Sequence, residues 1–332
     1  MDTFKIAQIF PQQINLNQID DCPGPCCMSY GFDTTPLVDS ISRIGLINPP
    51  ILIEKGEGRD EIKFTVVTGF RRIVALKALH VERLSCRILP SETSPLECLL
   101  MNLYDNLTVR ELNPVETGMA LTRLMELLPK EEVVKSFMPL LNLPSHLDKL
   151  HLFIRIEKDL ETPAKNLLAN GDMSMKATKL LLEMDSTARK RFCRFFSIIK
   201  FSKNQQTQFI DFVSDLSHIE NNAISGLLED YALTDIRDDE HMNNPQKARS
   251  LIKVLRSRRV PRLVKAEKGF RRMVEKLKLP AGHHIAPPPF FEGPDYRLEI
   301  SFRNGEDLME KLMMLTKKEG LVNFDDPWNK GI

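Results

Sequence analysis

The chain has 332 residues, of which 42% are hydrophobic and 27% are charged, a balance that is ordinary for a globular protein. It holds no apolar run of about 18 residues and its opening segment is polar, so we expect a cytoplasmic protein without a membrane partner. Six cysteines are too few for a disulfide framework in a chain of this length. The motif CPGPCC at 22–27 has no nearby histidine or second cysteine pair and is interpreted as a turn.

The first hundred residues alternate between short strand-like and helix-like segments. Helical apolar spacing predicts helices over 36–46 and 70–79. Strands are predicted at 49–55, 61–69 and 84–89. This mixture predicts a small α/β domain over residues 1–112.

The remainder of the chain is predicted to be mainly helical. Asn113-Pro114 is a typical helix start, with proline at the first helical position, and the helical pattern continues to about Tyr231. The predicted fold class is therefore α+β. After the first domain we expect three parts: a helical domain at 113–235, an acidic-to-basic linker with helices at 236–285, and a strand, turn and helix at 286–332.

The net charge of +1 conceals two oppositely charged segments. Gln205 to Asn244 contains nine acidic residues and one basic residue, whereas Gln246 to Lys278 contains thirteen basic residues and two acidic ones. The basic segment is typical of a nucleic-acid-binding arm, but it could instead pair with the acidic segment or form a solvated helix face. The residues expected to contact DNA phosphates are Arg256, Arg258, Arg259 and Arg262.

Three polar motifs in the first 120 residues carry chemistry that packing does not require. They are GLINPP at 45–50, TGFRR at 68–72 and DNLTVRELNPVE at 105–116. A glycine before a helix start leaves free backbone N–H groups, and adjacent arginines make that point attractive to an anion. Asp105 and Asn106 supply the oxygen ligands that Mg²⁺ accepts. Taken singly, the motifs could equally be a turn, two exposed arginines and a helix cap.

Together, in this order and spacing, the motifs resemble those of the ParB partition-protein family. The resemblance covers about residues 27–116 and implies a domain that binds CTP with Mg²⁺. The first motif then lies at the cytosine, the second at the phosphates, and the third at the metal and the reacting end. The residues that the resemblance assigns to the nucleotide are Gly45, Asn48, Pro49, Thr68, Gly69, Arg71, Arg72, Asp105 and Asn106, the last two also as metal ligands.

Two departures from the family pattern affect catalysis. Phe70 occupies the place where the family usually has glutamate, and Asp105 replaces a glutamate with a carboxylate that is one methylene shorter. We therefore expect nucleotide binding, with hydrolysis slow or absent. Asp105 is the candidate catalytic residue.

The helical middle of the chain has a partial resemblance to the same family. Residues 160–181 are similar to the stretch that follows the family's helix-turn-helix, with Gly171 ending one helix and Ser174 starting another. The helix-turn-helix is then expected at 131–156, although Pro139 interrupts its first helix. The candidate DNA-reading helix starts with Ser145, His146 and Lys149. A plain helical packing domain is the alternative.

The segment YRLEISFRNGEDLMEKLMML at 296–315 resembles the family's dimerisation unit. Leu298, Ile300 and Phe302 alternate as in a strand, which we expect to be a free edge that pairs with a second chain. The predicted function is that of a CTP-binding, DNA-associated homodimer in chromosome or plasmid partition. The resemblance implies association with the nucleoid and makes a ParA-type ATPase a candidate partner. The alternatives are a nucleotide-binding regulator without specific DNA reading, and a nuclease or phosphotransferase on the same scaffold.

Overall fold

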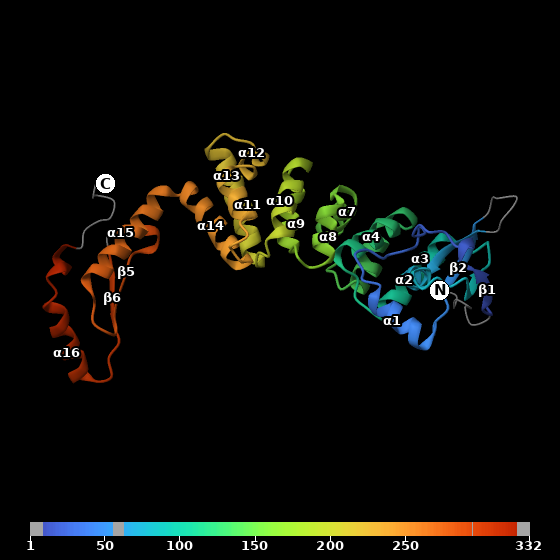
Figure 1. Cartoon of the computed structure of the whole chain (residues 1–332), viewed down its shortest axis with the longest axis horizontal. Coiled ribbons are helices and arrows are strands. Elements are labelled where there is room, and N and C mark those ends of the chain that lie inside the picture. The colour runs from blue at the N-terminus through green and yellow to red at the C-terminus, as the bar shows by residue number, and fades with distance from the viewer. Residues whose placement is uncertain (1–8, 56–62, 294, 324–332) are drawn as a thin grey trace. The chain divides into compact units, whose positions relative to one another are not determined.

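The computed structural model describes residues 9–55, 63–293 and 295–323. It divides into two compact units, Met1–Thr207 and Gln208–Ile332, and helix α11 (Lys203–Ile219) contains the division. Figure 1 shows the elements along the chain, with the strands of the first unit near the N-terminus. The mixed architecture confirms the predicted α+β fold class. The finer boundaries after residues 112, 235 and 285 stay predictions.

A four-stranded sheet organises the start of the first unit. Its order is β1-β4-β2-β3, where β2 is parallel to β4 and the other pairs are antiparallel. The strands are β1 (Gln12–Asn15), β2 (Ile51–Lys55), β3 (Lys63–Thr68) and β4 (Arg83–Leu89). The three predicted strands are confirmed within the described residues; residues 61 and 62 lie outside them. Strand β1 was not predicted because its sequence, QQIN, is polar except for Ile14, which is buried.

Three helices accompany this sheet. They are α1 (Thr35–Ile44), α2 (Phe70–Ala78) and α3 (Pro95–Leu107), and a 3-10 turn η2 (Leu16–Gln18) follows β1. Leu52, Val66 and Ile73 are fully or almost fully buried and belong to one cluster that joins the sheet to α1 and α2. This core holds β3 and α2 together. Because Gly69 alone separates them, the end of the strand and the beginning of the helix lie close to each other.

The rest of the first unit is helical, as the sequence predicts. Its helices are α4 (Pro114–Leu127), α5 (Lys130–Glu132), α6 (Met138–Leu140), α7 (Leu147–Asp159), α8 (Thr162–Ala169), α9 (Met175–Leu182) and α10 (Ser186–Ile198). Gly171 follows α8 with a φ of 78°, and the Ser174 side chain caps α9, as predicted. Pro139 does not break the helical path: a π-helical turn, η3 (Val133–Phe137), precedes it, and Pro139 then occupies the first turn of α6, where its missing N–H is tolerated.

The second unit contains helices and a small sheet. Its elements after α11 are α12 (Ile224–Leu228), α13 (Tyr231–Asp238), α14 (Asn244–Arg259), α15 (Pro261–Leu277), β5 (His283–Ala286), η4 (Pro289–Phe291), β6 (Arg297–Ile300), α16 (Gly305–Thr316) and η5 (Glu319–Asn323). Strand β6 pairs antiparallel with β5 of the same chain, and Phe302 lies beyond its end. The pairing with β5 was not predicted, because the short HHIA segment does not indicate a strand. Among the described residues β6 pairs on one side only, and its expected pairing with a second chain stays a prediction. Within the described residues, no helix is long and apolar enough to cross a membrane.

Candidate anion-binding cavity

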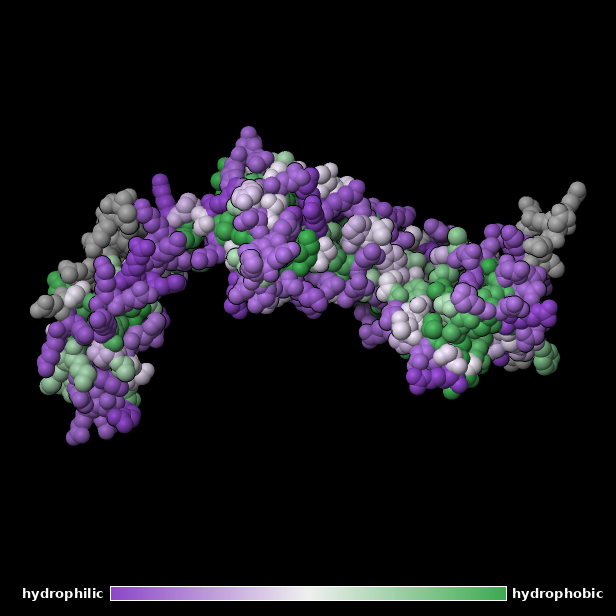
Figure 2. Space-filling model, in the orientation of Figure 1, coloured by the Kyte–Doolittle hydropathy of each residue, from purple (hydrophilic) through white to green (hydrophobic). Residues whose placement is uncertain are grey.

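A cavity of about 340 Å³ lies in the first unit and collects parts of all three polar motifs. Its lining includes seven of the predicted nucleotide residues: Gly45, Asn48, Gly69, Arg71, Arg72, Asp105 and Asn106. Pro49 and Thr68 do not line it, and Thr68 is buried at the end of β3. The remaining walls include apolar side chains of α1 and the following turn. Figure 2 shows hydrophobic side chains gathered over the region where Figure 1 labels α1 and α2.

Gly69 makes the sharp junction between β3 and α2 possible. It adopts a left-handed conformation with a φ of 87°, which side-chain-bearing residues rarely accept. A Cβ at this position would also lie 3.0 Å from Nε of Arg72, so the missing side chain leaves space for that guanidinium. Glycine is therefore required both by the backbone turn and by the packing of Arg72 across it.

Arg72 connects the first and third motifs. Its Nη1 donates to the backbone carbonyl of Asn48 at 2.7 Å, and its Nη2 donates to Oδ2 of Asp105 at 3.1 Å. Asp105 is about half exposed at the cavity, with 48% of its side chain accessible. One carboxylate oxygen of the candidate catalytic residue is therefore already paired with an arginine.

Asn106 is oriented by Asn102 on the same helix and by Arg110 just beyond the end of that helix. Its amide nitrogen donates to the backbone carbonyl and the side-chain oxygen of Asn102, at 2.8 and 2.9 Å, and its side-chain oxygen accepts from Nε of Arg110 at 2.9 Å. Asn102 in turn donates to the Val67 carbonyl in β3. This chain of contacts fixes the end of α3 against the sheet.

The oxygens of Asp105 and Asn106 fit an Mg²⁺ ion only in part. Mg²⁺ in nucleotide sites commonly takes one or two protein oxygens and completes its shell with phosphates and water. Both residues line the cavity, but Oδ2 of Asp105 and Oδ1 of Asn106 each accept a hydrogen bond from an arginine. Among the described residues, no group of three or more His, Cys, Asp or Glu side chains could hold a metal ion by itself.

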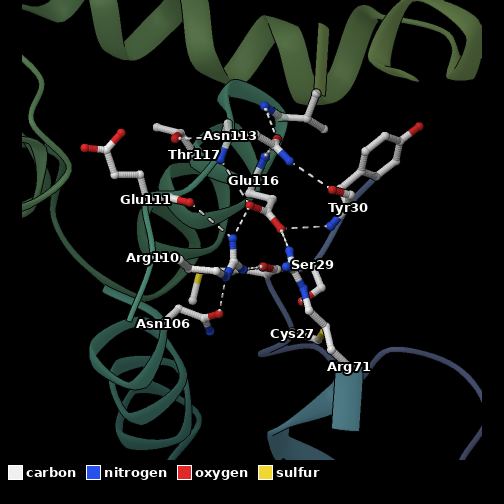
Figure 3. A network of polar contacts seen from close by, with 12 residues as sticks. Cys27, Ser29, Tyr30, Arg71, Asn106, Arg110, Glu111, Asn113, Glu116 and Thr117 are labelled. Carbon is white, nitrogen blue, oxygen red and sulfur yellow. Dashed lines mark hydrogen bonds and ion pairs between the residues drawn. The ribbon is translucent and has the colours of Figure 1, made fainter. Parts of the chain in front are cut away.

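A buried carboxylate behind the cavity was missed by the sequence analysis. Glu116 accepts hydrogen bonds from Nη2 of Arg71 at 2.7 Å and from Nη1 of Arg110 at 2.5 Å. It also accepts from the backbone N–H groups of Tyr30 and Asn113. Figure 3 shows the Glu116 carboxylate between the two guanidinium groups, at the centre of the polar network.

Arg71 faces both this carboxylate and the cavity. Besides Glu116, it contacts the Ser29 hydroxyl through Nε at 3.3 Å, and its guanidinium lies 4.7 Å from the centre of the Phe32 ring. Burial and then the positive charge of Arg110 lower the pKa of Arg71, while Glu116 raises it. No partner is found for its Nη1 among the described residues, so this nitrogen can donate to an incoming anion.

The sequence contains a partial signal for Glu116. Asn113-Pro114-Val115-Glu116 has the spacing of a capping box, and both of its reciprocal hydrogen bonds are present at the start of α4. That pattern predicts an acidic residue in the first turn of a helix. It does not predict that Tyr30, Arg71 and Arg110, from three other segments, meet the same carboxylate.

The residues predicted to contact DNA have two kinds of surroundings. Ser145, His146 and Lys149 are exposed at the beginning of α7. In the second unit, three of the four predicted arginines are ion-paired: Arg256 with Glu267, Arg258 with Glu220 and Asp230, and Arg259 with Asp215. Arg262 is exposed, and no ion-pair partner is found for it among the described residues. The acids that Arg258 and Arg259 contact belong to the segment 205–244, so pairing between the basic and acidic segments, one of the sequence-based alternatives, is present.

Comparison with known proteins gives structural matches only. No family model and no curated protein sequence matches the chain. The matches include two solved structures of the C-terminally truncated chromosome-partitioning protein ParB from Caulobacter crescentus. Each is 14% identical to this chain, and the match covers 98% of the ParB chain. The complex with CTP-gamma-S covers 56% of this chain with a TM-score of 0.27, and the complex with the centromeric parS site covers 60% with a TM-score of 0.32. At these TM-scores, the likeness does not indicate a function for this chain.

Proposed function

We propose that the chain is a ParB-like protein that binds CTP in the cavity of its first unit and associates with DNA in chromosome or plasmid partition. The observation that carries this proposal is the meeting of three motifs, separated by up to about sixty residues in sequence, around one cavity. Each motif brings the chemistry that the resemblance assigns to it. The turn at Gly45 and Asn48 offers backbone groups, α2 offers arginines, and α3 offers oxygens.

The phosphates would lie at the beginning of α2. A helix N-terminus contributes about 0.3–1 kcal/mol toward an anion, whereas micromolar affinity requires about 8 kcal/mol. The remainder would come from charge-assisted hydrogen bonds of Arg71 and Arg72, at about 1.5–3 kcal/mol each, and from the base. When bound, Mg²⁺ would neutralise phosphate charge, and Asp105 and Asn106 are the residues that would hold it.

Hydrolysis would be slow or absent in this arrangement. Asp105 is tied to Arg72, so it is poorly placed to act as a free general base. Phe70 replaces a polar side chain at the cavity wall. The same pairing of Asp105 gives no support to a nuclease or phosphotransferase.

Association with DNA is the less supported half of the proposal. Ser145, His146 and Lys149 are exposed and could reach a duplex, but the ion pairs of Arg256, Arg258 and Arg259 occupy cations that were expected at phosphates. This second observation leaves fewer cations for DNA phosphates, which supply most of the affinity for DNA, and so favours the alternative of a nucleotide-binding regulator.

The decisive experiment is calorimetric titration with CTP, ATP, GTP and UTP, each with and without Mg²⁺. We expect CTP to bind best and Mg²⁺ to strengthen its binding. Equal binding of all four nucleotides without dependence on the metal, or no binding, would contradict the proposed function. Electrophoretic mobility measurements on DNA fragments, with and without CTP, then separate the partition protein from the regulator.

A further inference from the structure

Glu116 is held in place by contacts other than those with the arginines that it binds. Each of its carboxylate oxygens accepts one arginine and one backbone N–H: Oε1 from Arg71 and Tyr30, and Oε2 from Arg110 and Asn113. The residue is fully buried in the first turn of α4 and does not line the cavity. Its position is therefore set by α4 and by the Tyr30 backbone.

The two arginines differ in their freedom to bind a ligand. All three guanidinium nitrogens of Arg110 have partners. Nε donates to Asn106, Nη1 donates to Glu116 and to the Glu111 carbonyl, and Nη2 donates to the Met28 carbonyl. Arg71 lacks a partner for Nη1 among the described residues, and 29% of its side chain is accessible. Of the pair, Arg71 is the one whose contacts an anion in the cavity can change.

One carboxylate between two guanidinium groups balances only part of their positive charge. A phosphate entering the cavity would approach Arg71 from the side opposite Glu116, and the two anions would repel each other at short range in a partly desolvated site. We propose that Glu116 is the resident counter-anion of Arg71 and Arg110, and that it competes for Arg71 with the phosphates of the bound ligand. This inference rests on the proposed function for the identity of the ligand.

Competition has a consequence that a purely structural role would not have. Neutralising Glu116 should strengthen phosphate binding, because the repulsion is lost and the arginine pair is left in need of an anion. If Glu116 instead only held Arg71 in place, the same change would weaken binding. The sign of the change in affinity therefore separates the two roles.

The test uses the full chain, its Glu116→Gln variant, and two probes, CTP with Mg²⁺ and inorganic tripolyphosphate, in calorimetric titrations. We expect Glu116→Gln to tighten the binding of both probes about three- to tenfold, the range that partial screening of one unit charge allows. In an Arg71→Ala background the gain should disappear, because the competition is for Arg71.

Glu97→Gln is the matched control. Glu97 has the same place in the capping box of α3 that Glu116 has in α4, but its carboxylate contacts Ser94 and does not line the cavity. Its neutralisation should leave the affinity for tripolyphosphate unchanged. An equal gain in this variant would attribute the effect to general charge and overturn the inference.

Glu116→Gln places an amide against two guanidinium groups, so its melting temperature is measured first. If it does not fold, Glu116→Asp replaces it, because this variant keeps the charge and withdraws it by one methylene from both arginines. Competition predicts a smaller gain in the same direction, whereas weaker or unchanged binding would overturn it.

The two probes separate this inference from the proposed function. If tripolyphosphate binds with the expected gain but CTP has no preference over other nucleotides, the counter-anion role stands and the proposed function fails. If CTP binds selectively and Glu116→Gln has no effect or weakens binding, the proposed function stands and the counter-anion role is wrong. If neither CTP nor tripolyphosphate binds, both are overturned.

Discussion

The two compact units differ in the kind of side chain that remains available for contact with another molecule. In the first unit, Arg71 faces a cavity and shares one buried carboxylate with Arg110, so part of its hydrogen-bonding capacity is unused. In the second unit, Arg258 meets two acidic side chains, and Arg259 meets one. The second unit instead exposes apolar side chains on α16, including Met309 and Met313, which are 55% and 58% accessible. A count of charges along the sequence does not distinguish these situations, because it does not tell which cations are already neutralised.

The ion pairs of Glu116 are more buried than that of Asp215, and this difference predicts the largest effect, on the free energy of unfolding. Glu116→Ala should lower the free energy of unfolding by about 3–5 kcal/mol, because it leaves two partly buried guanidinium groups without their shared anion. Asp215→Ala removes the partner of Arg259 in a pair whose side chains are 40% and 43% accessible, and should cost about 0–1 kcal/mol. Urea unfolding of both variants gives the comparison. Similar losses would mean that burial does not distinguish the two pairs.

The exposed face of α16 predicts a change of oligomeric state. Met309, Leu312 and Met313 lie at helical spacing on one exposed stripe, whereas Leu315 is buried within the unit. If this stripe is the dimer contact, Met309→Glu with Met313→Glu should give monomers in light scattering, because charges would be buried against a second copy. The neighbouring Glu310→Gln variant should remain dimeric. A double variant that still forms dimers would place the contact elsewhere.

Arg71→Ala tests whether the unused hydrogen-bonding capacity of Arg71 serves the binding of CTP. It should weaken CTP binding by about 1.5–3 kcal/mol, the usual contribution of a charge-assisted hydrogen bond. Arg43→Ala is the control, because Arg43 is 73% accessible, pairs with Asp39 within α1, and does not line the cavity. Calorimetry on both variants measures the difference, and equal losses would make Arg71 an ordinary surface charge.

The paired arginines of the second unit predict the smallest effect. Neutralising Arg256, Arg258 and Arg259 to glutamine should leave the slope of log K for DNA against log salt unchanged, because these cations serve carboxylates of the chain. Arg262→Gln should reduce the steepness of that slope by about 0.9, the contribution of one neutralised phosphate. Binding titrations at several salt concentrations decide this. A clear flattening in the triple variant would show that DNA displaces the ion pairs.

Local chemistry in the sequence was enough to predict most of the elements and several of the residues that line the cavity. Alternating apolar residues predict β3, helical spacing predicts α1 and α2, and Gly69 before two arginines predicts the junction between strand and helix. These features depend on residues close together in the chain. Their physical causes, backbone geometry and the burial of one face, therefore act within a short segment.

Only the tertiary structure decided which partners these residues have. The polar strand β1 forms because β4 offers it an edge, and β5 forms because β6 does. Glu116 is an ordinary helix-cap residue in the sequence, and it becomes a buried counter-anion because folding brings Tyr30, Arg71 and Arg110 to its carboxylate. Arg258, in a basic run, likewise finds its acids 28 and 38 residues away. The burial and pairing of a charge depend on long-range contacts, which the order of residues does not display.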